Sequence, residues 1–518
     1  FQQATSTAKQ SGKWSDAATW NVMPVNGSKV YVPPGITVVC DVVTPRLDWL
    51  RIDGNLVNSS NSSVFVEFSV VEQGGDISML GDNIRWTFID TGPLTDSFEL
   101  RRGLISFAGL TMQGPVVTPF VQLAIFPSAG DTTLRLASPV MGWQAGHELV
   151  LNGASIQELS LLSVAADGMT INVPPILESH PQPLDILGNP IPGAKFYVGN
   201  RSRGITFESE NPAIDRRGHV MFTHVHGQHG DNVELINVRF KNLGRTRTDR
   251  VVTDSYRRAD GTVSDGTSEL MARALQLIGI TEPTAEIGHR NERGRYAVHF
   301  HHRGVHADRH DTVKGCSVDG GLKVGVAVHQ SHVQVEDNFT YNIEGSHLFT
   351  EAGNELGTFA RNLCVKAPGS TQGRHQLGNP RSWELAEDVG WNGSGIWMQS
   401  PLTVVDDNVI SFIREAITIW TQGRTEFGVP TRIHKDFLTD PALIAKANQG
   451  DGTVDCRTVP LAGIDGLIVN TTQETIAAYE ISAGGTNESP IKNAVIWYAR
   501  DGVALYDATV DFHFTNFN

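Results

Sequence analysis

The sequence contains few cysteines, few positive charges and no long hydrophobic run. Its four cysteines are too few for a disulfide-dense scaffold, and their spacing fits no zinc motif. No stretch of about 18 apolar residues appears, so we expect no transmembrane helix. With 41 basic residues against 56 acidic residues, the formal net charge is −15, which argues against a nucleic-acid partner.

Long helical periodicity is also nearly absent, and this absence indicates the fold class. Short β-rich runs bounded by Gly, Asn, Asp and Pro follow one another along the chain, as at residues 29–32 and 37–43. We therefore expect an all-β protein. Trp14 and Trp20 flank a turn near the start of the chain, and we expect them to close one end of a hydrophobic core.

A short segment recurs from residue 296 onward, and this repeat indicates stacked coils. Most copies are followed by a second β-rich run. Coils of about 20–30 residues, each with two or three short strands, are typical of a parallel β-helix. The copies are YAVHFHH at 296, VGVAVHQ at 324, GSHLFTE at 345, SGIWMQS at 394 and EAITIWT at 415.

The repeat divides the chain into two regions. We predict an N-terminal β-rich region over residues 1–200 and a parallel β-helix over residues 201–518. Longer steps between copies indicate inserted loops, and loops of this length in a compact fold are often functional. The predicted insertions lie near residues 246–292, 369–390 and 426–460.

Histidines are crowded around the first copy, and the alternation of a β-strand predicts where they point. Successive side chains face opposite sides of a strand, so Val298 and Phe300 are predicted inside, with His299 and His301 outside. The same alternation in every copy gives two outward columns. One column holds His224 or His226, then His299, Ala327, His347 and Trp397, and the other holds His301, His329, Phe349 and Gln399.

A strip of histidine, tryptophan and glutamine beside long insertions is typical of a substrate groove. The alternative is a solvated face on which the histidines occur by chance. If the strip is a groove, we expect five residues to contact the substrate, namely Tyr296, Arg303, Lys323, Trp397 and Gln399.

The outward residues suit two routes for cleaving a uronic-acid polymer. Hydrolysis needs two carboxyl groups, and Glu351 is the best outward carboxylate, ahead of Asp308, Glu344 and Asp388. Elimination instead needs a base beside the uronate and a cation that neutralises its carboxylate. Both routes remain open. In either route the predicted catalytic residues are His299, His301, His347, Glu351 and Arg295.

The His-x-His pattern also allows a metal site. It places two imidazoles on one face of a strand, and the next coil can supply a third. Zinc or another divalent ion that prefers nitrogen is expected there, because calcium prefers oxygen ligands. The alternative is a metal-free cluster that acts as a base and hydrogen-bond donor. The candidate ligands are His224, His226, His299, His301 and His329.

Several segments carry a family resemblance. GRYAVHFH at 294–301 is similar to a Gly-Arg-Tyr-Pro-x-His-Phe/Trp-His signature, with Ala297 in place of the proline. NIEGSHLFTEAGNELGTFARNLCVKAPG at 342–369 is similar to a Tyr-Asn-x-x-Gly-His-x-Phe-Phe-Thr-Glu-Asp-Gly block and the segment after it, with Ala352 in place of the aspartate. Residues 12–60 resemble a glycine-rich module named for its eight glycines. Together these segments resemble the secreted and cell-surface hyaluronidases related to the cell migration-inducing hyaluronidase.

This resemblance implies a right-handed parallel β-helix that follows the glycine-rich module. It also implies a secreted, extracellular enzyme that degrades hyaluronan or a related uronic-acid polysaccharide, and it favours hydrolysis. The residues themselves leave two alternatives open: a polysaccharide lyase or epimerase acting on another anionic polymer, and a non-catalytic adhesin that binds glycans. In each case the expected partner is a polysaccharide.

Overall fold

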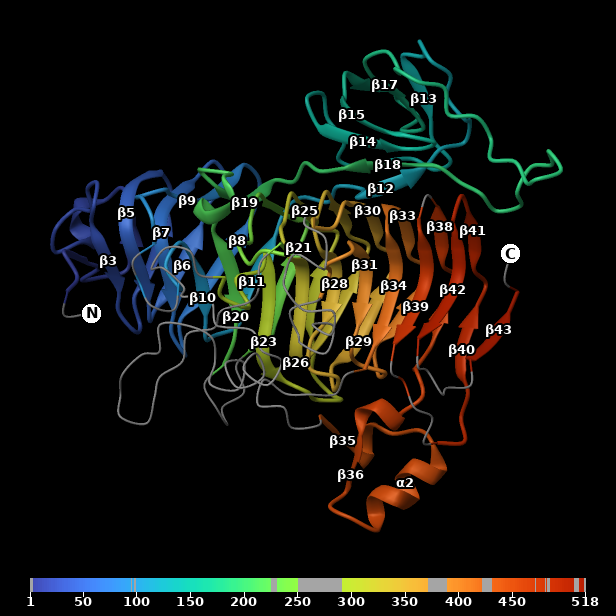
Figure 1. Cartoon of the computed structure of the whole chain (residues 1–518). Helices are drawn as coiled ribbons and strands as arrows, with labels where there is room; N and C mark the ends of the chain where they lie inside the picture. Colours follow the sequence, from blue (N-terminus) through green and yellow to red (C-terminus); the bar gives the residue numbers. More distant parts are fainter. Residues whose placement is uncertain are drawn as a thin grey trace.

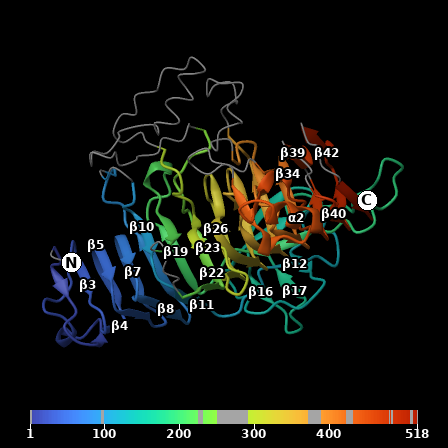
Figure 2. The same ribbon diagram turned by 90° about the horizontal axis from the view of Figure 1, so that it is seen from below.

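The chain winds into a long stack of β-coils, and the expected all-β parallel β-helix is confirmed. The computed structural model describes residues 3–94, 96, 99–224, 231–249, 291–370, 389–421, 431–470, 472–479, 481, 485–506 and 512–516. Each coil contributes strands to three parallel ladders, which we name faces 1, 2 and 3. The two termini lie at opposite ends of the stack (Figure 1), and the view from below shows the same arrangement (Figure 2).

The three faces follow one another around every coil. Face 1 contains β1 (Ser6–Thr7), β3 (Lys29–Val32), the second half of β5 (Val43–Ile52) and of β7 (Ser63–Val71), β10 (Gly103–Ser106), β20 (His219–Phe222), β23 (Val298–Gly304), the first half of β26 (Val324–Glu336), β28 (Ser346–Thr350), β31 (Ser394–Met398), β34 (Glu415–Trp420), β39 (Glu474–Tyr479) and β42 (Asp501–Tyr506). Face 2 contains β2 (Gly12–Lys13), β4 (Thr37–Cys40), β6 (Asn55–Asn58), β8 (Asp76–Leu80), β11 (Leu110–Gln113), β21 (Val233–Ile236), β24 (Asp311–Lys314), the second half of β26, β29 (Leu356–Ala360), β32 (Val404–Asp406), β37 (Ile464–Asp465), β40 (Ser489–Lys492) and β43 (Phe512–Thr515). Face 3 contains the first halves of β5 and β7, then β9 (Ile84–Phe88), β19 (Ile205–Ser209), β22 (Val238–Lys241), β25 (Ser317–Asp319), β27 (Phe339–Tyr341), β30 (Leu363–Ala367), β33 (Val409–Ile413), β38 (Ile468–Asn470) and β41 (Val495–Trp497).

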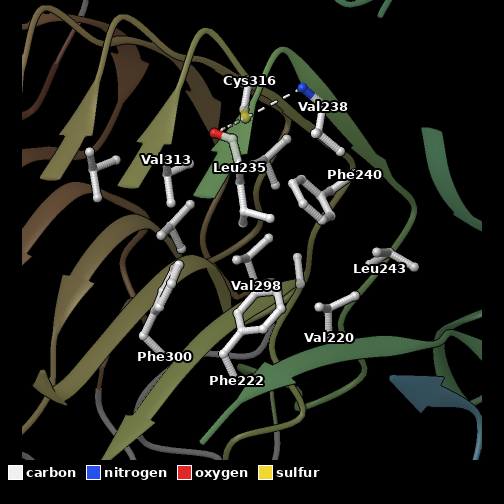
Figure 3. Close-up of a cluster of buried hydrophobic side chains, with 14 of the residues drawn as sticks. Val220, Phe222, Leu235, Val238, Phe240, Leu243, Val298, Phe300, Val313 and Cys316 are labelled. Atoms are coloured by element: carbon white, nitrogen blue, oxygen red, sulfur yellow. Dashed lines mark hydrogen bonds between the residues drawn. The ribbon is translucent and has the colours of Figure 1, made fainter. Parts of the chain in front are cut away.

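One hydrophobic core runs through the inside of the coils. On face 1 the inward positions are stacked in register, with Val298 beside Val326 and Val326 beside Leu348. Figure 3 shows this core at β20 and β23, where the ring centroids of Phe222 and Phe300 lie 5.2 Å apart. Because inward residues of successive coils touch one another, apolar burial holds each coil against the next.

The corner between faces 2 and 3 is built from polar residues. Asn338 Nδ2 donates to Asn362 Oδ1 at 2.9 Å, and Asn362 Nδ2 donates to Asn408 Oδ1 at 3.0 Å, so a buried asparagine ladder links three coils. Asparagines thus occupy this corner in three successive coils. In these and other coils, the residue just before the corner adopts a left-handed backbone, which Asn, Asp and Gly tolerate best. These residues are Asn237, Gly315, Asp337, Arg361, Asp407, Gly466 and Asn493.

The coils begin at β1, so the predicted boundary near residue 200 is not a boundary of the β-helix. Ser6 already pairs with Val30 in the ladder of face 1. The early coils share no sequence motif with the later ones, because the stack constrains mainly the inward positions, and for that reason the repeat was not visible there. Trp14 and Trp20 are buried in this first part of the core, with ring centroids 4.8 Å apart, as the sequence suggested.

A separate β-rich unit interrupts the stack between β11 and β19. This inserted unit, residues 119–200, is antiparallel and has its own core. It lies along the stack over face 3 (Figure 1), where Tyr197 and Tyr341 belong to one buried cluster and Asn152 Nδ2 donates to Ser411 Oγ at 3.0 Å. Its strands are β12 (Phe120–Gln122), β13 (Thr133–Arg135), β14 (Glu148–Asn152), β15 (Ile156–Ser160), β16 (Ser163–Val164), β17 (Thr170–Asn172) and β18 (Tyr197–Asn200).

A smaller excursion between β34 and β37 agrees in place with the insertion predicted at 426–460. It contains β35 (Arg432–His434), η6 (Lys435–Phe437), α2 (Pro441–Asn448), β36 (Thr453–Asp455) and η7 (Cys456–Thr458). Most of the other two predicted insertions, residues 250–290 and 371–388, lies outside the described residues. Within the described ranges, no helix combines the length and the hydrophobicity needed to cross a bilayer.

Candidate functional site

Three histidines and one glutamate meet at the corner where face 1 ends. His301 of β23 is in register with His329 of β26, and Glu351 N donates to Val328 O at 2.9 Å, which places Glu351 beside His329. His299 lies two residues before His301 on the same side of β23. The strands β23, β26 and β28 that carry these residues are neighbours in the stack (Figure 1). We name His299, His301, His329 and Glu351 the histidine cluster.

Backbone irregularities at the ends of these strands shape the cluster. The pairing between β23 and β26 shifts register after His301, which marks a β-bulge. Just after the cluster histidines, His302 and Gln330 adopt left-handed backbones with φ values of 53° and 45°. The ring of His302 thereby lies 4.3 Å from both the His301 and the His329 rings. His302 therefore packs against the cluster.

The imidazole of His299 is held in one orientation. Its Nδ1 atom lies 3.0 Å from the carbonyl oxygen of Gly294, so Nδ1 carries the proton and donates it, leaving a lone pair on Nε2. Gly294 has φ of 77°, and a Cβ atom there would lie 3.2 Å from the His299 ring. Glycine at position 294 thus permits both the turn and the close approach of the histidine.

Within the cluster, polar atoms face one another at short range. His299 Nε2 lies 3.4 Å from Glu351 Oε2, and His329 Nδ1 lies 3.7 Å from the same oxygen. His329 Nδ1 also lies 3.2 Å from His301 Nδ1. The side chains of Glu351 and His329 are 10% and 13% exposed, so the cluster is nearly closed but still reached by solvent. Among the described residues, His299 Nε2 and Glu351 Oε2 have no hydrogen-bond partner.

The burial of these groups sets their charge. Burial lowers the pKa of His329 to about 3, and burial together with the neighbouring imidazoles lowers the pKa of His301 still further below its ordinary value. Burial alone would raise the pKa of Glu351, but His329 and His299 hold it below its usual range. At neutral pH His301 and His329 are therefore neutral and Glu351 is ionised.

Glu355 supports the cluster from behind, and the sequence analysis did not identify it. Its carboxylate accepts backbone N–H groups of Gln330 at 3.0 Å, Ala352 at 2.6 Å and Gly353 at 2.8 Å. These residues follow His329 and Glu351, so Glu355 joins the two loops that carry them. Burial raises the pKa of Glu355 to about 7. Its position four residues after Glu351, in a stretch without strand alternation, gave no signal of this contact.

Two predicted catalytic residues lie away from the cluster. His347 is fully buried, with Nδ1 2.7 Å from Thr340 Oγ1, and burial lowers its pKa to about 3. Its predicted outward direction was wrong because the alternation breaks at the start of this strand. Val324 packs in an outer cluster, whereas Val326, two residues later, packs in the core. As a result Phe349, not His347, lies beside Ala327.

Arg295, the other predicted catalytic cation, is buried and turned toward an earlier part of the chain. Its Nε atom donates to the carbonyl oxygen of Glu99 at 3.1 Å, and Nη1 donates to Arg293 O at 2.9 Å. Arg293 was not predicted, yet its positive charge is close enough to lower the pKa of Glu351 and of His329. Among the described residues, Arg293 is therefore a better candidate than Arg295 for the cation that acts on the cluster.

Most of the predicted groove is closed in this structure. Tyr296, Phe349 and Trp397 belong to one buried cluster on the outer side of face 1, and Trp397 is 4% exposed. Gln399 is also 4% exposed, and its backbone N–H donates to Thr350 Oγ1 at 2.9 Å. Tyr296 remains close to the site, because its ring lies 5.0 Å from the His299 ring.

The two remaining residues predicted to contact the substrate, Arg303 and Lys323, are buried within the fold. Arg303 forms a bidentate pair with Asp311, with Nε to Oδ2 at 2.9 Å and Nη2 to Oδ1 at 3.0 Å. This pair neutralises the guanidinium, so Arg303 is not available to an anionic substrate. Lys323 is among the largest fully buried side chains, and its backbone N–H donates to Thr246 O at 3.1 Å.

The predicted metal ligands are brought together in part. The ligand atoms of His299, His301 and His329 all lie within 4.8 Å of one another. His224 is described but is not part of this group, and His226 lies outside the described residues. Of the other carboxylates considered, Asp308 is exposed, Asp388 lies outside the described residues, and Glu344 accepts a hydrogen bond from the Thr248 hydroxyl.

Two known families match parts of this sequence. Residues 17–88 match the G8 domain, and residues 283–428 match the CEMIP beta-helix. The chain contains a G8 domain and a CEMIP β-helix. The G8 match covers the first coils, from η1 (Ala17–Thr19) to β9, and the CEMIP β-helix contains the whole histidine cluster. The resemblance found in the sequence is thereby confirmed.

The chain is also similar in sequence to a larger protein, fibrocystin-L. Fibrocystin-L of Homo sapiens is 23% identical over 444 residues, which cover 77% of this chain and 9% of that protein. Fibrocystin-L of Mus musculus is 24% identical over 393 residues, which cover 69% of this chain and 9% of that protein. The chain thus spans about a tenth of the length of these relatives.

Solved structures match this chain only with low TM-scores and low sequence identity. The Gp54 tailspike of Acinetobacter baumannii bacteriophage AP22, in complex with A. baumannii capsular saccharide, has a TM-score of 0.15 and 8% identity, covering 89% of this chain and 66% of that chain. A structure named glycoside hydrolase has a TM-score of 0.20 and 9% identity, covering 90% of each chain. At such TM-scores these structures carry no argument about this protein.

Proposed function

We propose that this protein is an extracellular glycan-degrading enzyme that acts at the histidine cluster on hyaluronan or a related uronic-acid polysaccharide. The observation that carries this proposal is the ionised Glu351 carboxylate, nearly buried between His299 and His329, with Oε2 unpaired among the described residues. Holding such a group away from water is costly for the fold, and perturbed groups of this kind gather at functional sites.

The family match supports the same place on the molecule. The matched residues 283–428 include every member of the histidine cluster and also Glu355. The proposal of glycan degradation is inferred from the resemblance to hyaluronidases, whereas the geometry of the histidine cluster is observed in this protein. The two lines of support are therefore independent of each other.

A row of aromatic rings offers a surface on which sugars can stack. Trp397 and Trp420 lie 5.9 Å apart, Trp420 and Tyr479 lie 5.3 Å apart, and Tyr479 and Tyr506 lie 4.7 Å apart. The row begins near the cluster, where Trp397 is buried, and ends at Tyr506, which is 43% exposed. Flat rings with a polar edge suit the apolar faces of sugars. The exposed end of the row is therefore the better candidate for binding a chain.

The composition of the cluster favours elimination over two-carboxylate hydrolysis. Hydrolysis places two carboxyl groups on either side of the scissile bond, roughly 5–9.5 Å apart. Glu351 is the one carboxylate in the cluster, and Glu344 is engaged by Thr248. Elimination requires a single base, which removes the proton next to the uronate, and a positive charge close to its carboxylate. His329 is neutral and lies 3.7 Å from Glu351 Oε2, so its ring can accept a proton, and Arg293 supplies a positive charge nearby.

The test is degradation of hyaluronan, chondroitin, alginate and pectate by the full chain. Reducing ends and the ultraviolet absorbance of unsaturated products are both measured. A rise in both signals indicates a lyase, whereas reducing ends without absorbance indicate a hydrolase, and either result supports a glycan-degrading enzyme. The expected result is a rise in both signals on at least one polymer.

Two isosteric variants show whether the products come from the cluster. Glu351→Gln removes the buried charge, whereas Glu336→Gln changes a half-buried glutamate of β26 that pairs with Arg361. We expect Glu351→Gln to lose at least about 99% of the activity and Glu336→Gln to keep it. No product from any polymer, with the protein folded, would overturn the proposal. Retained polymer binding in that case would indicate a glycan-binding solenoid.

A further inference from the structure

We propose that His299, His301, His329 and Glu351 form a binding site for one divalent transition-metal ion of the zinc class. Three ring nitrogens whose positions all fall within 4.8 Å, together with a carboxylate oxygen, make up a ligand set found in zinc sites. The proposal goes beyond glycan degradation, because it concerns what the cluster binds in the absence of any polymer.

The distances between the ligand atoms agree with tetrahedral coordination. A zinc ion with ligands at about 2.0–2.1 Å in a tetrahedron holds those ligands about 3.3–3.4 Å apart. The three distances in the cluster are 3.2 Å from His301 Nδ1 to His329 Nδ1, 3.4 Å from His299 Nε2 to Glu351 Oε2, and 3.7 Å from His329 Nδ1 to Glu351 Oε2. These three of the six ligand–ligand distances therefore lie within a few tenths of an ångström of the tetrahedral values.

The hydrogen-bond roles of His299 strengthen this reading. Because Nδ1 donates to Gly294 O, the ring in its neutral form presents the lone pair of Nε2 toward Glu351 Oε2, which also has only lone pairs to offer. Two acceptors that face each other in a buried place repel unless a proton or a cation lies between them. Metal-binding histidines commonly donate their second nitrogen to a backbone carbonyl, as His299 does.

The charges and donor atoms point to the class of metal. The ligand set is one carboxylate and three imidazoles, so it offers one oxygen and three nitrogen donors. A dication would offset the buried negative charge of Glu351, which otherwise costs free energy. Nitrogen donors select zinc, cobalt, nickel or copper over calcium and magnesium, which prefer oxygen.

The surroundings hold the ligands in place. Glu355 fixes the backbone of Gln330 and of Ala352, each next to one ligand residue. The ring of His302 packs on two of the ligand rings, at 4.3 Å from each. Supporting contacts of this kind keep metal ligands in position before the ion binds. The partial exposure of His329 leaves a path for the ion.

The test measures metal binding directly on the full chain. The protein is treated with a chelator, dialysed, and titrated with Co²⁺ and then with Zn²⁺. We expect one equivalent of Co²⁺ to give the intense visible absorption of a tetrahedral site, one equivalent of Zn²⁺ to displace it, and Ca²⁺ to leave it unchanged. Metal content after gel filtration gives the stoichiometry. No polymer is present, so failure here and failure of the proposed function are distinguishable.

Variants connect the binding to the four residues. Glu351→Gln is isosteric and should weaken Zn²⁺ binding about tenfold or more, and His329→Ala about 100-fold or more. His310→Ala, which changes an exposed histidine, is the matched control and should bind as the wild type does. The proposal is overturned if the wild type takes up no stoichiometric metal. It is also overturned if folded Glu351→Gln and His329→Ala proteins bind with wild-type affinity.

Discussion

The chain contains a second group of histidines one corner away from the histidine cluster, and the two groups differ in how their polar atoms are satisfied. This outer group consists of His306, His310 and His332, which line a small pocket together with Arg303 and Asp311. His332 Nδ1 lies 2.5 Å from the His306 carbonyl oxygen, and its Nε2 lies 3.3 Å from Gln334 Nε2. Both ring nitrogens of His332 therefore have partners.

The carboxylates of the two groups differ in the same way. Asp311 is held by both arms of Arg303 and also accepts the backbone N–H of Val233 at 2.7 Å. Glu351 Oε2 has no such partner among the described residues. The same residue types, drawn from one stretch of sequence, thus form a structural corner in one place and an unsatisfied, buried cluster in the other. Histidine content alone does not distinguish the two.

The largest contrast is expected in activity. His301→Ala should lower turnover on a degradable polymer by roughly 10²–10⁴-fold, because it removes a group from the reaction centre. His310→Ala should keep turnover within about twofold, since His310 is exposed in the outer group. Initial rates at saturating polymer, with far-UV circular dichroism to confirm folding, measure both. Equal losses in the two variants would contradict the assignment of the cluster.

The contrast should reverse in stability. Asp311→Asn breaks a buried ion pair whose side chains are 5% and 6% exposed, and we expect it to lower the free energy of unfolding by about 3–5 kcal/mol. Glu351→Gln should change that free energy by less than about 1 kcal/mol in metal-free protein, because Oε2 has no partner to lose. Urea unfolding measures both values.

A matched control tests whether burial causes this stability difference. Asp337→Asn breaks an ion pair with Arg361 that is 43% and 33% exposed on its two sides, and should cost less than about 1 kcal/mol. If Asp311→Asn and Asp337→Asn cost the same, the outer group is not the structural corner described here.

Glu355 predicts a pH dependence of stability on the cluster side. Burial raises its pKa to about 7 from an ordinary value of 4.5, so the folded protein keeps this proton over a range in which the unfolded chain has lost it. The resulting stabilisation is complete below about pH 4.5 and is lost as the pH rises to about 7, amounting to roughly 2–3 kcal/mol. The difference in unfolding free energy between the wild type and Glu355→Gln, measured at pH 4.5, 5.5 and 7, should show this fall, because the buried histidines titrate alike in both proteins.

Replacing Glu355 provides the comparison. Glu355→Gln should remove this contribution between pH 4.5 and 7, because the amide does not titrate, whereas Glu336→Gln should keep the pH dependence of the wild type. An unchanged slope in Glu355→Gln would show that another group is responsible.

The smallest expected effect is an absence of titration. In metal-free protein, the ring signals of His301 and His329 should stay constant between pH 5 and 8, because burial holds both imidazoles neutral with pKa values of about 3 or lower. Histidine ring NMR, assigned by His301→Ala and His329→Ala, follows each signal. A midpoint between pH 6 and 7 for either ring would contradict the burial described here.

The sequence predicted the fold and about half of the candidate site. Alternation correctly placed Val298 and Phe300 in the core and His299 and His301 outside it, because an unbroken strand of period two leaves one solution. It failed at His347, where the chain kinks before the regular strand and shifts the alternation by one residue. A local kink of this kind depends on the neighbouring coils and leaves no signal in a single sequence.

Pairing between distant segments was the other limit. Nothing in the sequence shows that Arg303 turns toward Asp311, or that Glu355 reaches the backbone behind His329, because both contacts cross a loop whose path is set by packing. The inserted unit was also missed as a separate body. Its strands are short β-rich runs like those of the coils, so the pattern of runs marks no boundary in the sequence.

The inserted unit also affects how the protein folds during synthesis and how it unfolds. A stack in which each coil touches only its neighbours frays from its ends, one coil at a time. The inserted unit follows β11 in the chain. Its core includes Trp497, which belongs to a much later coil, at β41. During synthesis the core of this unit stays incomplete until the coil that carries Trp497 has been made. Loss of that coil would open a core that begins near residue 119, so the inserted unit couples the stability of coils that lie far apart in the sequence.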